Sequence, residues 1–187
     1  LEAGYGQWGR GVMQRDLEDA VDWAVQRGLA DPKRVGMYGV SYGGYAVLAG
    51  LAFAPERYAC GVALAAPLNL ASLVGSVPPE WTPLRARLLQ RIGDMEGDAA
   101  LNRSLSPVFH ADAIRAPLLL ARGADDARVR AQDVERIADS LREREIPVEV
   151  VTYKDEGPRL ERMEHRMDFY ARSEAFLARH LGGRAEP

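Results

Sequence analysis

The chain has 187 residues, of which 24 are basic and 27 acidic, and a formal net charge of -3 at pH 7. This length suits one hydrophobic core and is short for two ordinary domains, so we expect a single domain over residues 1–187. The two signs of charge are mixed along the chain, which argues against a nucleic-acid footprint and against a polybasic membrane patch. No apolar run approaches the roughly 20 residues that span a bilayer. We therefore expect a small-molecule or peptide partner, no nucleic acid and no membrane.

Cysteine content says little about the compartment. Cys60 is the only cysteine, so it cannot form an internal disulfide, and its apolar surroundings predict a buried strand residue. No charged-then-apolar leader precedes Tyr5, although the chain starts without a methionine, which leaves room for a signal peptide or a whole domain upstream. These observations leave the compartment open, with the cytoplasm favoured.

Hydrophobic periodicity predicts helices and strands that alternate along the chain. The predicted helices cover residues 16–29, 45–53, 134–141 and 164–181. The predicted strands cover residues 34–39, 58–66, 118–121 and 148–153. Such alternation implies right-handed crossovers and a parallel sheet with helices on both faces. The stretch 69–116 is rich in proline and glycine, with a short amphipathic piece at 84–92, and is predicted to be an excursion from the sheet.

A candidate nucleophile lies between the predicted strand 34–39 and the helix that follows it. Gly39-Val40-Ser41-Tyr42-Gly43, followed by Gly44, matches the G-x-S-x-G nucleophile elbow, which requires this strand-to-helix setting. The sharp turn strains the serine backbone and projects its hydroxyl above the sheet, and glycines are expected where a Cβ would collide. We predict Ser41 as the nucleophile and the backbone N–H of Tyr42 as an oxyanion donor. The alternative is an ordinary glycine-rich turn.

The sequence around the elbow and three later runs carry a family resemblance. Residues 31–46, 106–112, 114–119 and 123–129 resemble the prolyl oligopeptidase family of serine peptidases, in particular its acylaminoacyl-peptidase-like and dipeptidyl-peptidase-like members. The similarity extends from about Tyr5 to Leu181. It implies an α/β-hydrolase fold and hydrolysis of short peptides through an acyl-enzyme on Ser41, with no cofactor and no metal.

The resemblance also implies parts that are absent from these 187 residues. The family's fold has further strands before the one ending at Gly39, a loop there with a second oxyanion donor, and often an upstream β-propeller domain. We therefore expect the C-terminal part of a longer enzyme. The strand 34–39 would then lack one neighbour, leaving an apolar sheet edge prone to association.

Further site residues follow from the family's pattern. Its catalytic aspartate stands in a D-x-R-V pattern after the third strand here, which selects Asp126, while the adjacent Asp125 stays an alternative. A buried carboxylate is needed at this place to orient and stabilise an imidazole. The same pattern implies that Arg128 contacts a substrate carbonyl and that Val129 lines the specificity pocket. Trp81, in the excursion, is a candidate pocket wall, with ordinary packing as the alternative.

The catalytic histidine is missing from its expected place. Where family members have D-E-G-H-G-F, this chain has Asp155-Glu156-Gly157-Pro158-Arg159-Leu160, so Pro158 occupies the histidine position. Proline cannot accept the serine proton, and the loss of a triad member costs several orders of magnitude in rate. Of the three histidines, His110 is expected to be structural and His180 to lie near the end of the last helix. His165, at the predicted start of the final helix, is the one candidate replacement, and a surface helix residue is the favoured alternative.

Three functions remain open from the sequence: a serine peptidase, an esterase that uses the same elbow, and a catalytically silent binding module. The gene itself offers another explanation of Pro158. The codons CCA-CGG-CTT encode Pro-Arg-Leu, and the same bases shifted by one give His-Gly followed by Phe or Leu. A local pair of insertion and deletion errors would thus convert the motif, and any other codons at residues 158–160 would exclude this hypothesis.

Overall fold

A computed structural model describes residues 8–185, so the start of the resemblance at Tyr5 lies outside the described part. The four strands are β1 (Gly36–Val40), β2 (Cys60–Leu64), β3 (Leu118–Gly123) and β4 (Val148–Tyr153). The α-helices are α1 (Val12–Gln26), α2 (Tyr42–Phe53), α3 (Leu70–Gly75), α4 (Thr82–Ile92), α5 (Ala99–Leu105), α6 (Ala131–Arg142) and α7 (Met163–Leu181). Two 3-10 helices, η2 (Pro32–Arg34) and η3 (Pro107–Ala113), complete the elements of this part.

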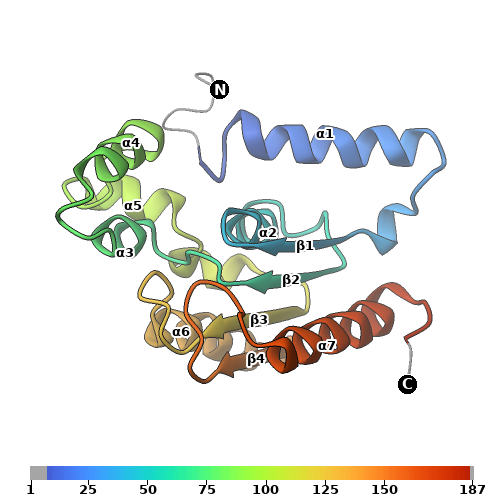
Figure 1. The fold of residues 1–187 in the computed structure, drawn as a ribbon. Coiled ribbons are helices and arrows are strands. Elements are labelled where there is room, and N and C mark those ends of the chain that lie inside the picture. Colours follow the sequence, from blue (N-terminus) through green and yellow to red (C-terminus); the bar gives the residue numbers. More distant parts are fainter. Residues whose placement is uncertain (1–7, 186–187) are drawn as a thin grey trace.

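The strands form one parallel sheet, as predicted from the alternation of helices and strands. Their order in the sheet is β1-β2-β3-β4 (Figure 1). Gly39 lies opposite Ala63, and Ala63 lies opposite Leu120, so the C-terminal ends of the strands share one edge of the sheet. In parallel α/β sheets this edge is where ligands bind. Ser41 and Asp126 each follow a strand at this edge.

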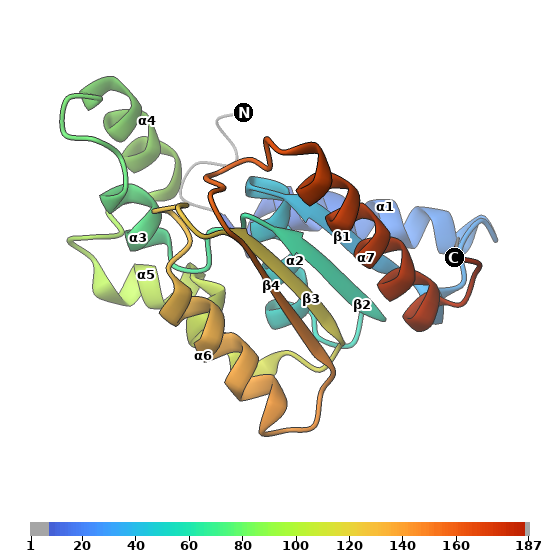
Figure 2. The ribbon, with the colours of Figure 1, turned by 60° about the horizontal axis from the view of Figure 1, so that its bottom comes forward.

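Helices cover both faces of the sheet, because alternate strand residues point to opposite sides. One face, with Ala63, Leu118 and Leu120, packs against α2, α6 and η3 in the largest buried cluster. The other face, with Val62 and Leu119, packs against Phe169 and Phe176 of α7. Figure 2 shows α7 on one side of the strands, with α2 and α6 on the other. The layers therefore hold the strand ends rigidly at the candidate site.

The excursion between β2 and β3 is more helical than predicted. The amphipathic piece at 84–92 lies within α4, whereas α3 and α5, of 6 and 7 residues, had no detectable periodicity. Figures 1 and 2 place α3, α4 and α5 beside one another beyond the C-terminal ends of the strands. The last part, η3, belongs to the main body, where Val108 and Ile114 are buried between α2 and α6.

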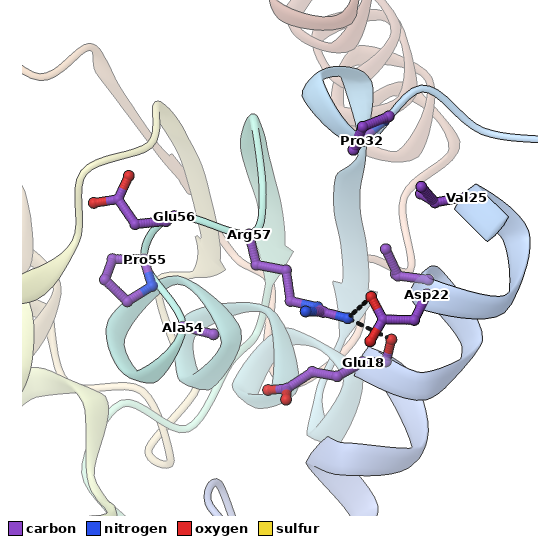
Figure 3. A pocket seen from close by; sticks show the side chains of 9 residues that line it. Glu18, Asp22, Val25, Pro32, Ala54, Pro55, Glu56 and Arg57 are labelled. Atoms are coloured by element: carbon purple, nitrogen blue, oxygen red, sulfur yellow. Dashed lines mark hydrogen bonds and ion pairs between the residues drawn. The ribbon is translucent and has the colours of Figure 1, made fainter.

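The N-terminal edge of the sheet carries a hollow that is far from the elbow along the strands. It lies between α1 and the loop that leads into β2, and Figure 3 shows Arg57 extending across it towards Glu18 and Asp22. Arg57 donates to the Glu18 carbonyl at 2.7 Å and forms an ion pair with Asp22. These bonds attach α1 to the sheet. Within residues 8–185, no helix has the length and apolar character to cross a membrane.

Candidate active site

Ser41 occupies a strained backbone conformation between β1 and α2. Its φ of 56° and ψ of -117° lie outside the regions that residues with a Cβ favour, at a cost of about 1–3 kcal/mol. Its backbone N–H donates to the Leu64 carbonyl at 2.9 Å, and its own carbonyl accepts the N–H of Tyr45 at 3.0 Å. These two bonds tie the turn to β2 and to the first turn of α2. The strained backbone predicted for a nucleophile elbow is therefore present.

The glycines around Ser41 do not all serve the same purpose. A Cβ on Gly39 would lie 2.2 Å from the backbone of Gly43, and one on Gly44 would lie 2.8 Å from the Ala66 Cβ. A Cβ on Gly43 would meet no atom within 4 Å. The expectation that side chains would collide at every flanking glycine is therefore correct for Gly39 and Gly44 and wrong for Gly43.

Helix α2 begins at Tyr42, directly after the candidate nucleophile. The first backbone N–H groups of a helix have no intrahelical acceptor, and the helix dipole favours negative charge near them. The Tyr42 N–H is one of these groups and is available to an oxyanion beside Ser41. Helix α2 is buried on all sides from Gly44 to Ala52, which fixes the direction of its N-terminus.

The two candidate acids after β3 differ sharply in environment. Asp126 is 2% exposed, whereas Asp125 is exposed and uses its backbone N–H to bind the Glu156 carbonyl at 2.9 Å. A triad acid has to be buried and hydrogen-bonded to remain an ionised, fixed acceptor. The burial therefore favours Asp126 over Asp125.

Arg128 is the partner of Asp126. Its backbone N–H and Nε donate to Asp126 Oδ1 at 3.0 and 2.9 Å, and its Nη2 donates to Oδ2 at 2.9 Å. The same Nη2 lies 3.3 Å from the carbonyl oxygen of Pro158. The side chain is directed at the acid and at the loop that lacks histidine.

The structure shows the surroundings of two residues that were expected to bind substrate. Val129 is fully buried and packs with Val134 and Ile137 of α6, and it borders the open hollow around Asp126. Its role in a specificity pocket stays a prediction. Trp81 is 56% exposed at the start of α4, which leaves its indole ring accessible.

His165 is bound to a different carboxylate. Its Nδ1 lies 2.8 Å from Glu156 Oε1, and its ring packs on Tyr153 at the end of β4. Glu156, 2% exposed, also accepts the backbone N–H groups of Glu161 and Arg162 at 2.7 and 3.0 Å. The Glu161 N–H, with smaller effects from Arg162 and His165, lowers the pKa of Glu156 to about 2 against the opposing effect of burial. Through these contacts His165 stabilises the loop between β4 and α7.

The other histidines have structural surroundings. His110 binds the Arg103 carbonyl through Nε2 at 2.8 Å and packs edge-on against Phe53, as expected for a structural residue. His180 packs on Phe176, and burial lowers its pKa, so its contribution at the end of α7 is packing more than charge. Within residues 8–185, no hydrogen bond reaches the Ser41 hydroxyl.

The parallel sheet with its strained strand-to-helix turn defines an α/β-hydrolase fold, and comparison with known proteins supplies the family. A model of the prolyl oligopeptidase family matches residues 1–184, and the chain belongs to this family. It is 44% identical over 187 residues to "Dipeptidyl aminopeptidase BIII" of Pseudoxanthomonas mexicana, covering 99% of this chain and 27% of that protein. It is 39% identical over 189 residues to "Dipeptidyl peptidase family member 6" of Caenorhabditis elegans, covering 99% and 25%. The chain thus spans about a quarter of the length of these relatives.

Solved structures agree with the fold. A puromycin-hydrolyzing peptidase of Mycobacterium tuberculosis superposes with a TM-score of 0.88 at 26% identity, covering 97% of this chain and 27% of that one. An acylaminoacyl peptidase in complex with Z-Gly-Gly-Phe-chloromethyl ketone superposes with a TM-score of 0.81 at 23% identity, covering 100% and 30%. The second likeness concerns the fold alone.

Two features of the site were not predicted from the sequence. Glu156 was noted only as a member of the motif around Pro158, and no sequence pattern signals that its carboxylate binds the backbone N–H groups of Glu161 and Arg162. The pairing of Arg128 with Asp126 gives no signal in the sequence, because it depends on the conformation of the loop after β3.

Proposed function

We propose that this chain contributes the nucleophile and the acid of a serine peptidase domain that acts on short peptides. The observation that carries the proposal is the strained backbone of Ser41 at the N-terminus of α2, because strain at a turn is retained where function requires it. Membership of the prolyl oligopeptidase family supports peptides as the substrate class.

In the proposed reaction, Ser41 Oγ attacks the scissile carbonyl carbon while its proton passes to an imidazole base. The C–N bond then breaks, and the amine leaves with that proton as the acyl-enzyme forms. The Tyr42 N–H would stabilise the negative charge on the carbonyl oxygen, which is the usual effect of a pre-oriented donor at a helix start. Asp126 would hold an imidazole in the correct tautomer and stabilise its charged form. Water then hydrolyses the ester on Ser41 to release the second product.

The base of this reaction has no occupant in the motif after β4. Pro158 holds the histidine position, and His165 is bound to Glu156 at 2.8 Å. Without a base the Ser41 hydroxyl is a weak nucleophile. We therefore propose that the domain with Pro158 is a dormant peptidase, and that substitution of this one residue restores measurable reactivity.

A second candidate function is a binding module that keeps the cleft without turnover. The specific observation in its favour is that Arg128 takes both oxygens of Asp126, the acid that a working base would need. Such a module would bind short peptides at the C-terminal edge of the sheet. An esterase uses the same elbow and is a third outcome of the test.

The test uses a fluorophosphonate label on the full-length protein in three forms. We expect no labelling with Pro158, labelling with Pro158→His, and loss of that labelling in Pro158→His with Ser41→Ala. Turnover of short peptides and of small esters by Pro158→His then separates a peptidase from an esterase. If Pro158→His stays unlabelled while the unmodified protein binds peptides, the silent binding module is the better description.

A further inference from the structure

Both oxygens of the candidate acid are already bonded by one neighbouring residue. Arg128 Nε and Nη2 form two parallel bonds to Oδ1 and Oδ2 of Asp126, each 2.9 Å long. The Arg128 backbone N–H adds a third bond to Oδ1 at 3.0 Å. A two-pronged guanidinium–carboxylate pair is among the strongest and most directional interactions of charged side chains. The Asp126 side chain has no exposed surface, so solvent does not compete for these bonds.

Arginine can hold an acid, but it cannot act as a base. Its guanidinium stays protonated at any pH at which proteins work, so it cannot take the proton of Ser41. Its positive charge also disfavours the charged form of an imidazole placed beside it, which lowers the pKa of that imidazole. An arginine paired with the acid therefore opposes a histidine that needs the same acid.

The loop with Pro158 is fixed close to Arg128. The Glu156 carbonyl accepts the Asp125 N–H at 2.9 Å, and a Cβ on Gly123 would lie 2.2 Å from the Gly157 carbonyl oxygen. Further along the loop, the Glu156 carboxylate binds the N–H groups of Glu161 and Arg162. The loop is thus bonded on both sides of residue 158. The contact of Arg128 Nη2 with the carbonyl oxygen of Pro158, at 3.3 Å, uses the backbone and would survive a change of side chain.

We propose that Arg128 is a positioning residue that takes the place of the missing histidine as the partner of Asp126. It also joins the loop after β3, which carries Asp126, to the loop at residue 158. We call these contacts of Arg128 the clasp. The proposal rests on the function above in one respect, namely that Asp126 is the acid of this site. It assigns Arg128 a role different from the contact with a substrate carbonyl that the family resemblance implies. The clasp keeps the Asp126 carboxylate bonded and buried while its base is absent. It also means that a histidine restored at residue 158 has to compete with Arg128 for the acid.

The first test asks whether Arg128 and Asp126 act as a pair in the full-length protein with Pro158. Thermal unfolding is measured for Arg128→Gln, for Asp126→Asn and for the double variant. We expect Arg128→Gln alone to lower the Tm by about 2–4 °C, because it leaves a buried carboxylate without its partner. The same substitution should change the Tm little when Asp126 is already Asn.

The matched control for this cycle is Arg130→Gln, the same substitution at an exposed arginine two residues along the same loop. We expect it to leave the Tm unchanged. The proposal is overturned if the Tm changes of Arg128→Gln and Asp126→Asn add up to that of the double variant. It is also overturned if Arg128→Gln and the control have the same Tm.

The second test separates positioning from a merely structural role. The rate of fluorophosphonate labelling is measured against pH for Pro158→His and for Pro158→His with Arg128→Gln. Removal of Arg128 frees Asp126 to stabilise the imidazolium, so the double variant should label about ten-fold faster. Its pH midpoint should also rise, because the imidazole gains a negative neighbour and loses a positive one.

A slower double variant with an unchanged pH midpoint would contradict the clasp and would fit the substrate contact that the resemblance implies. Failure of Pro158→His to label at all is a different result. It would count against the proposed dormant peptidase, while the thermal cycle would still decide whether Arg128 holds Asp126.

Discussion

At the scale of single residues, the site combines strain and buried charge that the fold has to support. Ser41 is held at a φ of 56° by bonds to β2 and α2, and Glu156 is held ionised by two backbone N–H groups. Both features concern stability as much as chemistry. They can therefore be measured whether or not the domain turns over a substrate.

The strain at Ser41 predicts an unusual order of stability among its variants. Ser41→Gly should be more stable than Ser41→Ala by about 1 kcal/mol, since glycine adopts positive φ without the steric cost that alanine carries. The control is the same pair of substitutions at Ser140 inside α6, where Gly should be less stable than Ala by about 1 kcal/mol. Urea unfolding measures both differences. The same order at both positions would show that the Ser41 backbone is not strained.

Glu156 predicts a specific pH dependence of stability. Its pKa is lowered from 4.5 to about 2 in the folded protein, so the unfolded state binds a proton first as the pH falls. The stability that the ionised carboxylate contributes is complete above about pH 4.5 and is lost as the pH falls through about 2. We expect the difference in unfolding free energy between the wild type and Glu156→Gln to be constant near neutral pH and to shrink in acid.

The subtraction in that experiment is needed because Asp168 also has a lowered pKa, caused first by its bond with Arg172. Both proteins keep Asp168, so its contribution cancels. A difference that stays flat down to pH 2 would contradict the bonding of Glu156 in the loop before α7.

At the scale of elements, the sequence was informative wherever a segment is long and has a clear apolar period. All four strands and the helices α1, α2, α6 and α7 follow from such patterns. Helices α3 and α5 could not be predicted, since 6 or 7 residues span too few turns to show a helical period. The elbow was visible as a motif, whereas the bonds among Asp126, Arg128 and the loop at Pro158 depend on three-dimensional placement. Side-chain pairing of that kind has no sequence period.

The elbow predicts opposite effects for two glycines that are four residues apart. Gly39→Ala should destabilise the protein by about 3 kcal/mol or more, because its Cβ would meet backbone atoms that cannot move without breaking the turn. Those atoms are the carbonyl group of Gly43, at 2.2 Å. Gly43→Ala is the matched control, since its Cβ meets nothing within 4 Å and the residue lies in α2. It should stabilise the protein by up to about 1 kcal/mol. Chemical denaturation compares the two, and equal losses would contradict the geometry of the turn.

At the scale of the whole molecule, the sheet has two edge strands within residues 8–185, β4 on one side and β1 on the other. There β1 pairs with β2 only, and two of its side chains, Tyr38 and Val40, are each 45% exposed. Tyr170 of α7 lines a small cavity together with these two residues, and Met167 and Met163 are exposed one and two turns before it. We call Tyr38, Val40, Met163, Met167 and Tyr170 the edge patch. It combines free backbone hydrogen-bonding groups with apolar surface, which is the combination that promotes strand-to-strand association.

The edge patch predicts that the 187-residue chain, expressed alone, associates with itself in a concentration-dependent way. Tyr38→Lys should reduce the association, because a charged side chain on an edge strand disfavours pairing with another chain. Leu29→Lys provides the control, since Leu29 is 69% exposed and lies beyond the end of α1, outside the edge patch. Sedimentation velocity over a range of concentrations measures the effect. If both lysine variants reduce association equally, net charge is the cause, and if neither does, the edge of β1 is not the contact surface.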